Sequence, residues 1–292
     1  MPNDLPVMFK NDPQSKGWFS GLDTILVQDG EILDGGGAVV EFVEEVKEGL
    51  VLGKNSVLKN VTLVGNGKGV GVRIPRNTSR YRMDNVRVTN WGKGYDLEYC
   101  WIGTVTHCFA NGCGNGINIH GKSVNDLHWI GGEINGCDNG IMVEGSDHQG
   151  SKFELCIEGN KQHGVWMRGQ TECYRFRDCY FEGNGNCSVL VDCWTNDGTV
   201  IHGCVFGKFR KPEIILNRGY SAHIKECAWY GTCVDPPIIV GKWARDTIID
   251  NNSWTTTTGI VRLHADKIKN NTTKVTAHAP WWPRETQWAN KL

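Results

Sequence analysis

The sequence predicts an all-β protein built from stacked coils, a parallel β-helix, and three observations lead to this fold class. Glycine is abundant, at 37 of 292 residues, whereas leucine contributes only 15. Short apolar runs recur every 22–25 residues, and polar corner residues recur with nearly the same period. A helical bundle would need a composition richer in leucine, alanine, glutamate and lysine. We therefore expect a turn-rich β protein.

The apolar runs define the repeat. Each follows a glycine or a turn, as in Gly116-Ile117-Asn118-Ile119 and Gly140-Ile141-Met142-Val143. A second run recurs between them, for example Phe153 to Ile157 and Phe176 to Phe181. A leucine-rich solenoid has a similar period, but its consensus requires several leucines in each repeat. The alternation favours a parallel β-helix of about ten coils over residues 36–264.

Asparagines mark the ends of the second runs. Asparagine tolerates left-handed backbone and bonds the backbone of its own turn, so it suits a tight corner. Amides stacked once per coil can also bond each other along the axis. We expect such stacking along the series Asn66, Asn90, Asn111, Asn135, Asn160 and Asn184.

The two ends of the chain lack the repeat. Residues 1–35 contain three prolines and are predicted to form an N-terminal cap or an attachment arm. Residues 265–292 are polar and then contain Trp281, Trp282 and Trp288. These tryptophans predict either a docking surface for another subunit or a cap folded over the last coil, so this segment is a C-terminal cap or an oligomerisation segment.

The twelve cysteines all lie between Cys100 and Cys233, and none forms a CxxC pair. A chain of this length can fold without disulfides. We predict that most of them are free thiols, buried as small apolar residues. This suits assembly in a reducing cytoplasm.

Charge and hydropathy exclude several classes of partner. Lys plus Arg total 31 and Asp plus Glu total 32, so the basic excess expected of a nucleic-acid or anionic-membrane binder is lacking. No apolar run approaches the ~20 residues of a membrane span. The first ten residues lack the pattern of a signal peptide. We expect no nucleic-acid partner, no membrane insertion and no signal peptide.

Three stretches resemble proteins of a known superfamily. The segment from Gly37 to Gly67 is similar to the first coils of the pectate-lyase-like right-handed parallel β-helix superfamily. The turns Ile157-Glu158-Gly159-Asn160 and Phe181-Glu182-Gly183-Asn184 resemble turns in bacteriophage tailspikes and depolymerases of that superfamily. The resemblance implies a right-handed coil, a homotrimer, and a virion location after assembly in the host cytoplasm. It also implies attachment to other virion tail proteins through the N-terminal segment.

Acidic side chains are the candidate catalytic groups. If the apolar residues of the run from Phe153 to Ile157 point inward, the acids between them point outward. Coil-to-coil alignment then predicts one column of Glu133, Glu158 and Glu182 and a second column of Glu154 and Asp178. Coils ~4.8 Å apart would bring carboxyls near the roughly 5 Å of a retaining glycosidase or, two coils apart, the roughly 6.5–9.5 Å of an inverting one. Alternatively, these acids bond the turn backbone or form a solvated face.

Aromatic and basic side chains are the candidate substrate-binding groups. The same alternation points Trp129 and Tyr180 outward and places His107 in the column of Tyr180, whereas His128 is expected to face inward. Arg177 supplies a cation for a uronate carboxylate. No calcium-binding loop or other ligand set is present, so we predict no metal and no cofactor.

Two functions remain open from the sequence. The first is a tailspike-like or tail-fibre-like virion protein that binds host-surface polysaccharide and also depolymerises it, as a glycoside hydrolase or lyase. The second is a non-enzymatic fibre or adhesin of the virion, which binds glycans or other virion subunits. A cellular polysaccharide lyase or glycoside hydrolase is a further alternative, and the N-terminus weakens it. The fold alone does not choose among them.

Overall fold

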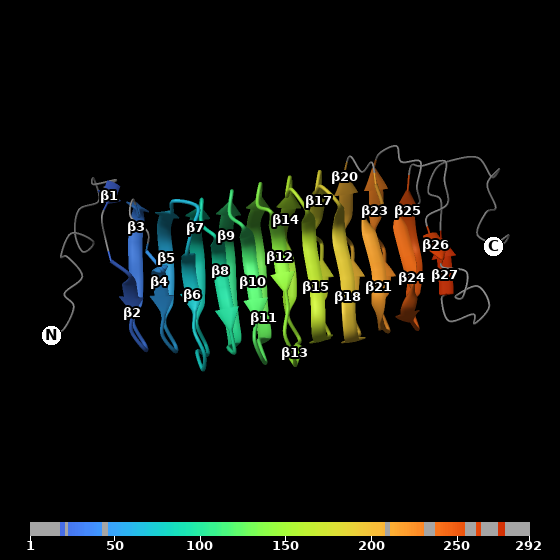
Figure 1. The fold of residues 1–292 in the computed structure, drawn as a ribbon, viewed down its shortest axis with the longest axis horizontal. Coiled ribbons are helices and arrows are strands. Elements are labelled where there is room, and N and C mark those ends of the chain that lie inside the picture. The colour runs from blue at the N-terminus through green and yellow to red at the C-terminus, as the bar shows by residue number, and fades with distance from the viewer. Residues whose placement is uncertain are drawn as a thin grey trace.

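A computed structural model describes residues 18–20, 23–42, 46–207, 211–230, 237–254, 261–263 and 274–277. Over these residues the chain winds about one long axis from β1 to β27, and every paired strand is parallel to its neighbours in the next coil (Figure 1). The predicted right-handed parallel β-helix of about ten coils is confirmed. No helix in the described residues is long and apolar enough to cross a membrane.

Each coil contributes in turn to three parallel sheets, which we call sheets 1, 2 and 3. Sheet 1 consists of β2 (Ile25–Val27), β4 (Glu48–Leu52), β6 (Val70–Ile74), β8 (Lys93–Glu98), β10 (Asn115–His120), β12 (Asn139–Val143), β15 (His163–Glu172), β18 (Cys187–Asp197), β21 (Ile214–Tyr220), β24 (Ile238–Arg245) and β26 (Val261–Leu263).

Sheets 2 and 3 share several long strands, whose first halves lie in sheet 2 and second halves in sheet 3. These are β3 (Ile32–Glu41), β5 (Val57–Val64), β7 (Arg82–Thr89), β9 (Trp101–Asn111), β11 (Asn125–Asn135), β14 (Lys152–Glu158) and β25 (Ile248–Trp254). Sheet 2 also contains β16 (Arg175–Arg177), β19 (Val200–His202), β22 (His223–Lys225) and β27 (Lys274–Ala277). Sheet 3 also contains β1 (Trp18–Ser20), β17 (Tyr180–Glu182), β20 (Val205–Gly207) and β23 (Ala228–Tyr230). The two-residue β13 (His148–Gln149) pairs with β11 and β15 at the corner between sheets 1 and 2.

A single left-handed residue forms the corner between sheets 2 and 3 in most coils. Such a residue inserts one extra position, so the in–out alternation restarts after it. The coil of β14 lacks it, since only Leu155 separates Glu154 from Cys156 where its neighbours have two residues. The left-handed corners, with φ between 49° and 70°, are Asn60, Asn85, His107, Gly131, Asp178, Gly203, Glu226 and Asn251.

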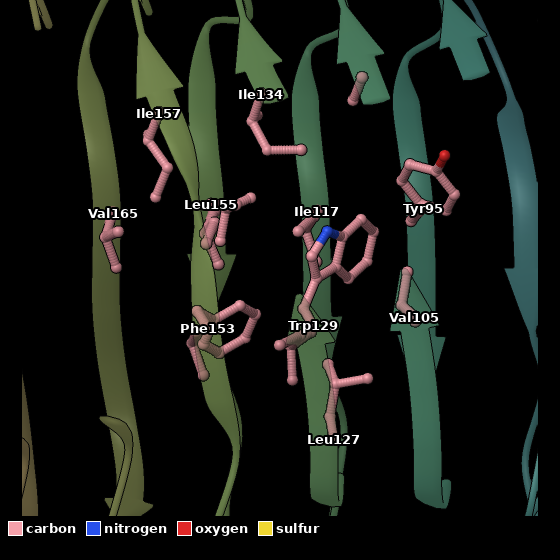
Figure 2. Packing of buried hydrophobic residues seen from close by; sticks show 14 of the residues in the cluster. Tyr95, Val105, Ile117, Leu127, Trp129, Ile134, Phe153, Leu155, Ile157 and Val165 are labelled. Carbon is pink, nitrogen blue, oxygen red and sulfur yellow. The ribbon is translucent and has the colours of Figure 1, made fainter. Parts of the chain in front are cut away.

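The core fills the interior of the coil with one continuous apolar cluster, in which equivalent side chains stack from coil to coil (Figure 2). Phe181, Phe206 and Trp229 stack nearly parallel, with ring centroids 5.0 and 4.9 Å apart. Such offset aromatic contacts add to the stability that burial of the rings already supplies.

Buried cysteines directly follow several of the left-handed corner residues. Cys108, Cys179, Cys204 and Cys227 occupy this position and are buried. The eleven cysteines within the described residues are all free, and Cys233 lies outside them. Burial raises the pKa of the Cys108 thiol to about 12, so this thiol is inert at neutral pH. The predicted use of thiols as small core residues is confirmed for this column.

The asparagine series does not form a single column. Asn160 donates from its amide to the amide oxygen of Asn184, at 2.9 Å, so stacking occurs there. Asn111 and Asn135 instead align with each other and with Glu158. The predicted amide stack is therefore only partly present.

The ends of the chain lie largely outside the described residues. Paired strands begin at β1 and end at β27, whereas residues 1–17 and 278–292, with all three terminal tryptophans, fall outside. The predicted terminal caps therefore remain predictions.

Gly132→Ala tests the tight approach of neighbouring coils. A Cβ at Gly132 would lie 1.9 Å from the carbonyl oxygen of Cys108, and φ there is +92°. We expect a loss of at least about 3 kcal/mol in the free energy of unfolding, measured by denaturant titration. Gly112→Ala is the control, because its φ of +61° is also left-handed but no atom lies within 4 Å. It should cost only about 1–2 kcal/mol, and equal losses in both variants would contradict the clash.

Glu213→Gln tests a buried carboxyl. Burial raises the pKa of Glu213 from 4.5 to about 7, although Ser188 donates to it. Because the folded pKa exceeds the unfolded one, the associated stability is full below pH 4.5 and is lost as pH rises to 7. The variant is neutral at every pH, so it should not show this fall in the free energy of unfolding, which amounts to at most roughly 3 kcal/mol. Parallel stability curves for parent and variant between pH 4.5 and 8 would contradict the assignment.

Candidate functional site

Sheet 3 brings together part of the predicted acidic site. Glu158 and Glu182 are aligned Cα partners on adjacent coils, and Cys156 is aligned with Tyr180 in the next column. Glu133 is aligned with Cys156, not with Glu158. The predicted column of three glutamates is therefore wrong, but the three side chains do share one outer face.

Hydrogen bonds tie these acids to neutral neighbours. The amide of Asn135 donates to Glu133 at 2.7 Å and to Glu158 at 3.2 Å. The hydroxyl of Tyr180 donates to Glu182, and this bond raises the pKa of Tyr180 to about 12. The result is an acidic patch, defined here as Glu133, Glu158 and Glu182, whose oxygens can accept hydrogen bonds from hydroxyl groups.

The predicted outward position of Trp129 is wrong. Trp129 is fully buried and packs edge-to-face on Tyr95, with ring centroids 4.9 Å apart (Figure 2). His128 points outward instead and lies 3.1 Å from Asp126. The prediction applied the in–out alternation of β14 to the preceding coil. That coil has an extra corner residue, which β14 lacks, so the alternation differs between the two.

The second predicted acidic column is also absent. Glu154 lies on sheet 2, where its partner in the preceding coil is Ile130. In the following coil, sheet 2 presents Arg175 and Arg177. Asp178 is the exposed corner residue that comes next. His107 is a corner residue too, 71% exposed, with Nδ1 3.3 Å from Asp84. Glu154 and Arg177 therefore lie on sheet 2, whereas the acidic patch lies on sheet 3. The corner residues His107 and Asp178 belong to neither sheet.

Sheet 1 presents a charged row that the sequence analysis missed. The row follows the C-terminal ends of consecutive strands and alternates in sign over its second half. Arg168 Nε donates to Glu144 at 2.9 Å, and Arg218 Nε lies 3.1 Å from Asp192. The row consists of Glu98, His120, Glu144, Arg168, Asp192 and Arg218.

A surface pocket of about 380 Å³ lies over this row. Trp194 forms one wall and is 71% exposed, and the Arg218 guanidinium lies 4.2 Å from its ring centroid. The register of β15 and β18 shifts there, because Trp194 is an extra residue that the bulge turns outward. The lining residues are Glu144, Gly145, Arg168, Gly169, Asp192, Trp194 and Arg218.

Asp96 organises the other end of the same face. It is buried and accepts hydrogen bonds from Asn118 at 2.7 Å and Lys93 at 3.1 Å. Arg73 pairs with it as well, and His120 Nε2 lies 3.0 Å from it. Burial, followed by the charges of Lys93 and Arg73, lowers the pKa of His120, so its ring is neutral at pH 7. This end offers a neutral imidazole oriented by a carboxylate.

The sequence contained a signal for this face. Asp96 and Asn118 are aligned in the middle of two consecutive apolar runs. The aligned residue in the next coil is Met142. Polar residues at matched positions of adjacent coils indicate side chains that point away from the apolar interior. No group of three or more potential metal ligands occurs within the described part of the chain.

No protein-family model and no curated protein matches the chain. Among solved structures, ORF18 of Geobacillus virus E2 superposes with a TM-score of 0.60 at 16% identity, covering 84% of this chain and 52% of that one. The catalytic domain of a GH87 α-1,3-glucanase in complex with tetrasaccharides superposes with a TM-score of 0.54 at 13% identity, covering 92% and 65%. The chain thus spans about half of the phage protein and just under two thirds of the glucanase domain. At these identities the likeness shows the shared fold.

Glu158→Gln and Glu182→Gln test the predicted catalytic role of the acidic patch. If these carboxyls transfer protons, each variant should lose about 10²–10⁴-fold in the release of reducing ends from a cleaved polysaccharide, with little change in melting temperature. Tyr180→Phe is the control for the hydrogen bond to Glu182. Folded variants with parental activity would show that these acids are not catalytic.

Proposed function

We propose that the protein is a tailspike-like or fibre-like virion component that binds host-surface polysaccharide along sheet 1. The observation that carries this proposal is the pocket around Trp194, where an exposed indole stands beside two arginine–carboxylate pairs. The predicted attachment through residues 1–35 to other virion tail proteins belongs to the same proposal.

The chemistry of the pocket suits a sugar. The exposed face of an aromatic ring packs on the apolar face of a sugar ring, while its edges stay hydrated. Arginine and carboxylate groups supply strong donors and acceptors for neighbouring hydroxyls. The volume of about 380 Å³ falls within the range of ordinary ligand sites.

The length of the face suits a polymer. Glu98 and Arg218 are five coils apart, which corresponds to about 24 Å at ~4.8 Å per coil. Half-buried side chains of Trp166 and Leu190 lie in the middle of this face, in register with Met142. An extended oligosaccharide can therefore contact several coils at once.

The fold likeness supports this proposal. One similar structure belongs to a phage protein, and another is a glucanase domain in complex with tetrasaccharides. Depolymerisation is a second activity of the same proposal, and the glutamine variants above test it separately from binding.

Trp194→Ala should raise the dissociation constant for the glycan at least about tenfold, because the sugar ring loses the aromatic ring on which it packs. This corresponds to roughly 1.4 kcal/mol of binding free energy. Binding of the parent protein to an array of bacterial capsular and O-antigen polysaccharides identifies the ligand, and titration calorimetry with that ligand measures the loss. Tyr230→Ala is the matched control, because Tyr230 is also exposed, at 56%, but lies on sheet 3. Equal affinity of Trp194→Ala and parent would contradict the assignment of the site.

A further inference from the structure

The charges that line the pocket on sheet 1 cancel. Its lining contains two arginines, Arg168 and Arg218, and two carboxylates, Glu144 and Asp192, and its other residues are uncharged. Each arginine forms an ion pair with one of these carboxylates. The pocket therefore has a formal charge of zero, although it contains four charged side chains.

Both guanidinium groups already have carboxylate partners. Arg168 donates from Nε and from a terminal nitrogen to the same oxygen of Glu144, and its guanidinium carbon lies 4.9 Å from the ring centroid of Trp166. Arg218 lies over the ring of Trp194, and its Nε is 3.1 Å from Asp192. An arginine binds a ligand carboxylate best through two parallel N–H groups. In both arginines the edge that contains Nε already faces a carboxylate of the protein.

The two carboxylates border the space that a sugar would occupy. The side chains of Glu144 and Asp192 are 38% and 32% exposed, so a ligand in the pocket can reach them. The amide of Asn217 donates to Asp192 at 2.9 Å and holds it from a second side. An anionic group placed here would face like charges, which lowers affinity. A hydroxyl group meets no such conflict, because it can donate to a carboxylate and accept from an arginine.

We propose that Glu144 and Asp192 are specificity-determining residues, through which the pocket accepts uncharged sugar units and rejects uronates and other acidic sugars. This inference rests on the proposed glycan site and names the class of sugar that the site takes. The selection works by exclusion, since the two carboxylates neutralise the cations that would otherwise attract an acidic polymer. The arginines then serve as donors to neutral hydroxyl groups.

Removing the two carboxylates tests the proposal as a gain of binding. In Glu144→Gln with Asp192→Asn, both arginines lose their charged partners while the side chains keep nearly the same shape. We expect this variant to bind sodium polygalacturonate, a polymer of uronate units, with a dissociation constant at least about tenfold below that of the parent, measured by titration calorimetry. The gain should shrink between about 0.1 and 1 M salt, because it comes from charge.

The matched control neutralises two paired acids outside the pocket. Asp138 pairs with Lys161, and Glu226 pairs with His202. Asp138→Asn with Glu226→Gln changes the net charge of the protein by the same amount, so it should leave affinity for polygalacturonate at the parental level. Circular dichroism melting shows whether each variant is folded.

The polysaccharide array separates this inference from the proposed function. Ligands of the parent that depend on Trp194 should be uncharged, and the pocket variant Glu144→Gln with Asp192→Asn should bind them within about threefold of the parent. An acidic Trp194-dependent ligand that loses affinity when its carboxyls are reduced to alcohols would overturn the inference and leave glycan binding intact. A folded pocket variant with no gain for polygalacturonate would also overturn it. If the parent binds no polysaccharide, the proposed function fails and the inference fails with it.

Discussion

The hydrogen bonds that stack one coil on the next fix the neighbours of most side chains in the described residues. Because every strand pairing between these coils is parallel, a residue lies directly above its equivalent in the preceding coil, at ~4.8 Å. Interior columns therefore repeat the same kind of side chain, as the stacked rings of Phe181, Phe206 and Trp229 show. Exterior columns follow the same rule, so charge and shape form rows along the axis.

The corner between sheets 2 and 3 decides which residues belong to which row. A left-handed residue there adds one position and shifts the alternation, and the coil of β14 lacks this residue. This one-residue difference places Trp129 in the core and Glu133 beside Glu158, not above it. Cysteines occupy the interior position directly after four of the left-handed corners, and burial raises the pKa of the Cys108 thiol to about 12.

The three sheets offer three chemically distinct faces. Sheet 1 combines a pocket, an exposed indole and alternating charges, with a neutral His120 held by Asp96 at its far end. Sheet 2 is basic in its middle, and sheet 3 is acidic at the same height. A long repeat fold can thus present faces of different chemistry, because each sheet points in a different direction.

The sequence by itself determined the fold class, the period and the use of free thiols, because these depend on composition and on spacings that survive small local shifts. It also identified Glu158, Tyr180 and Glu182 as neighbours on one outer face, since both of their coils share the same register beyond the corner. Only the tertiary structure decided the positions of Trp129, Asp178 and His107, because one left-handed residue inverts the alternation and its presence leaves little trace in the sequence. The pocket on sheet 1 also required the structure. Its wall is Trp194, which a bulge turns outward, and its charged pairs join residues about 25 positions apart that only the stacking of coils brings together.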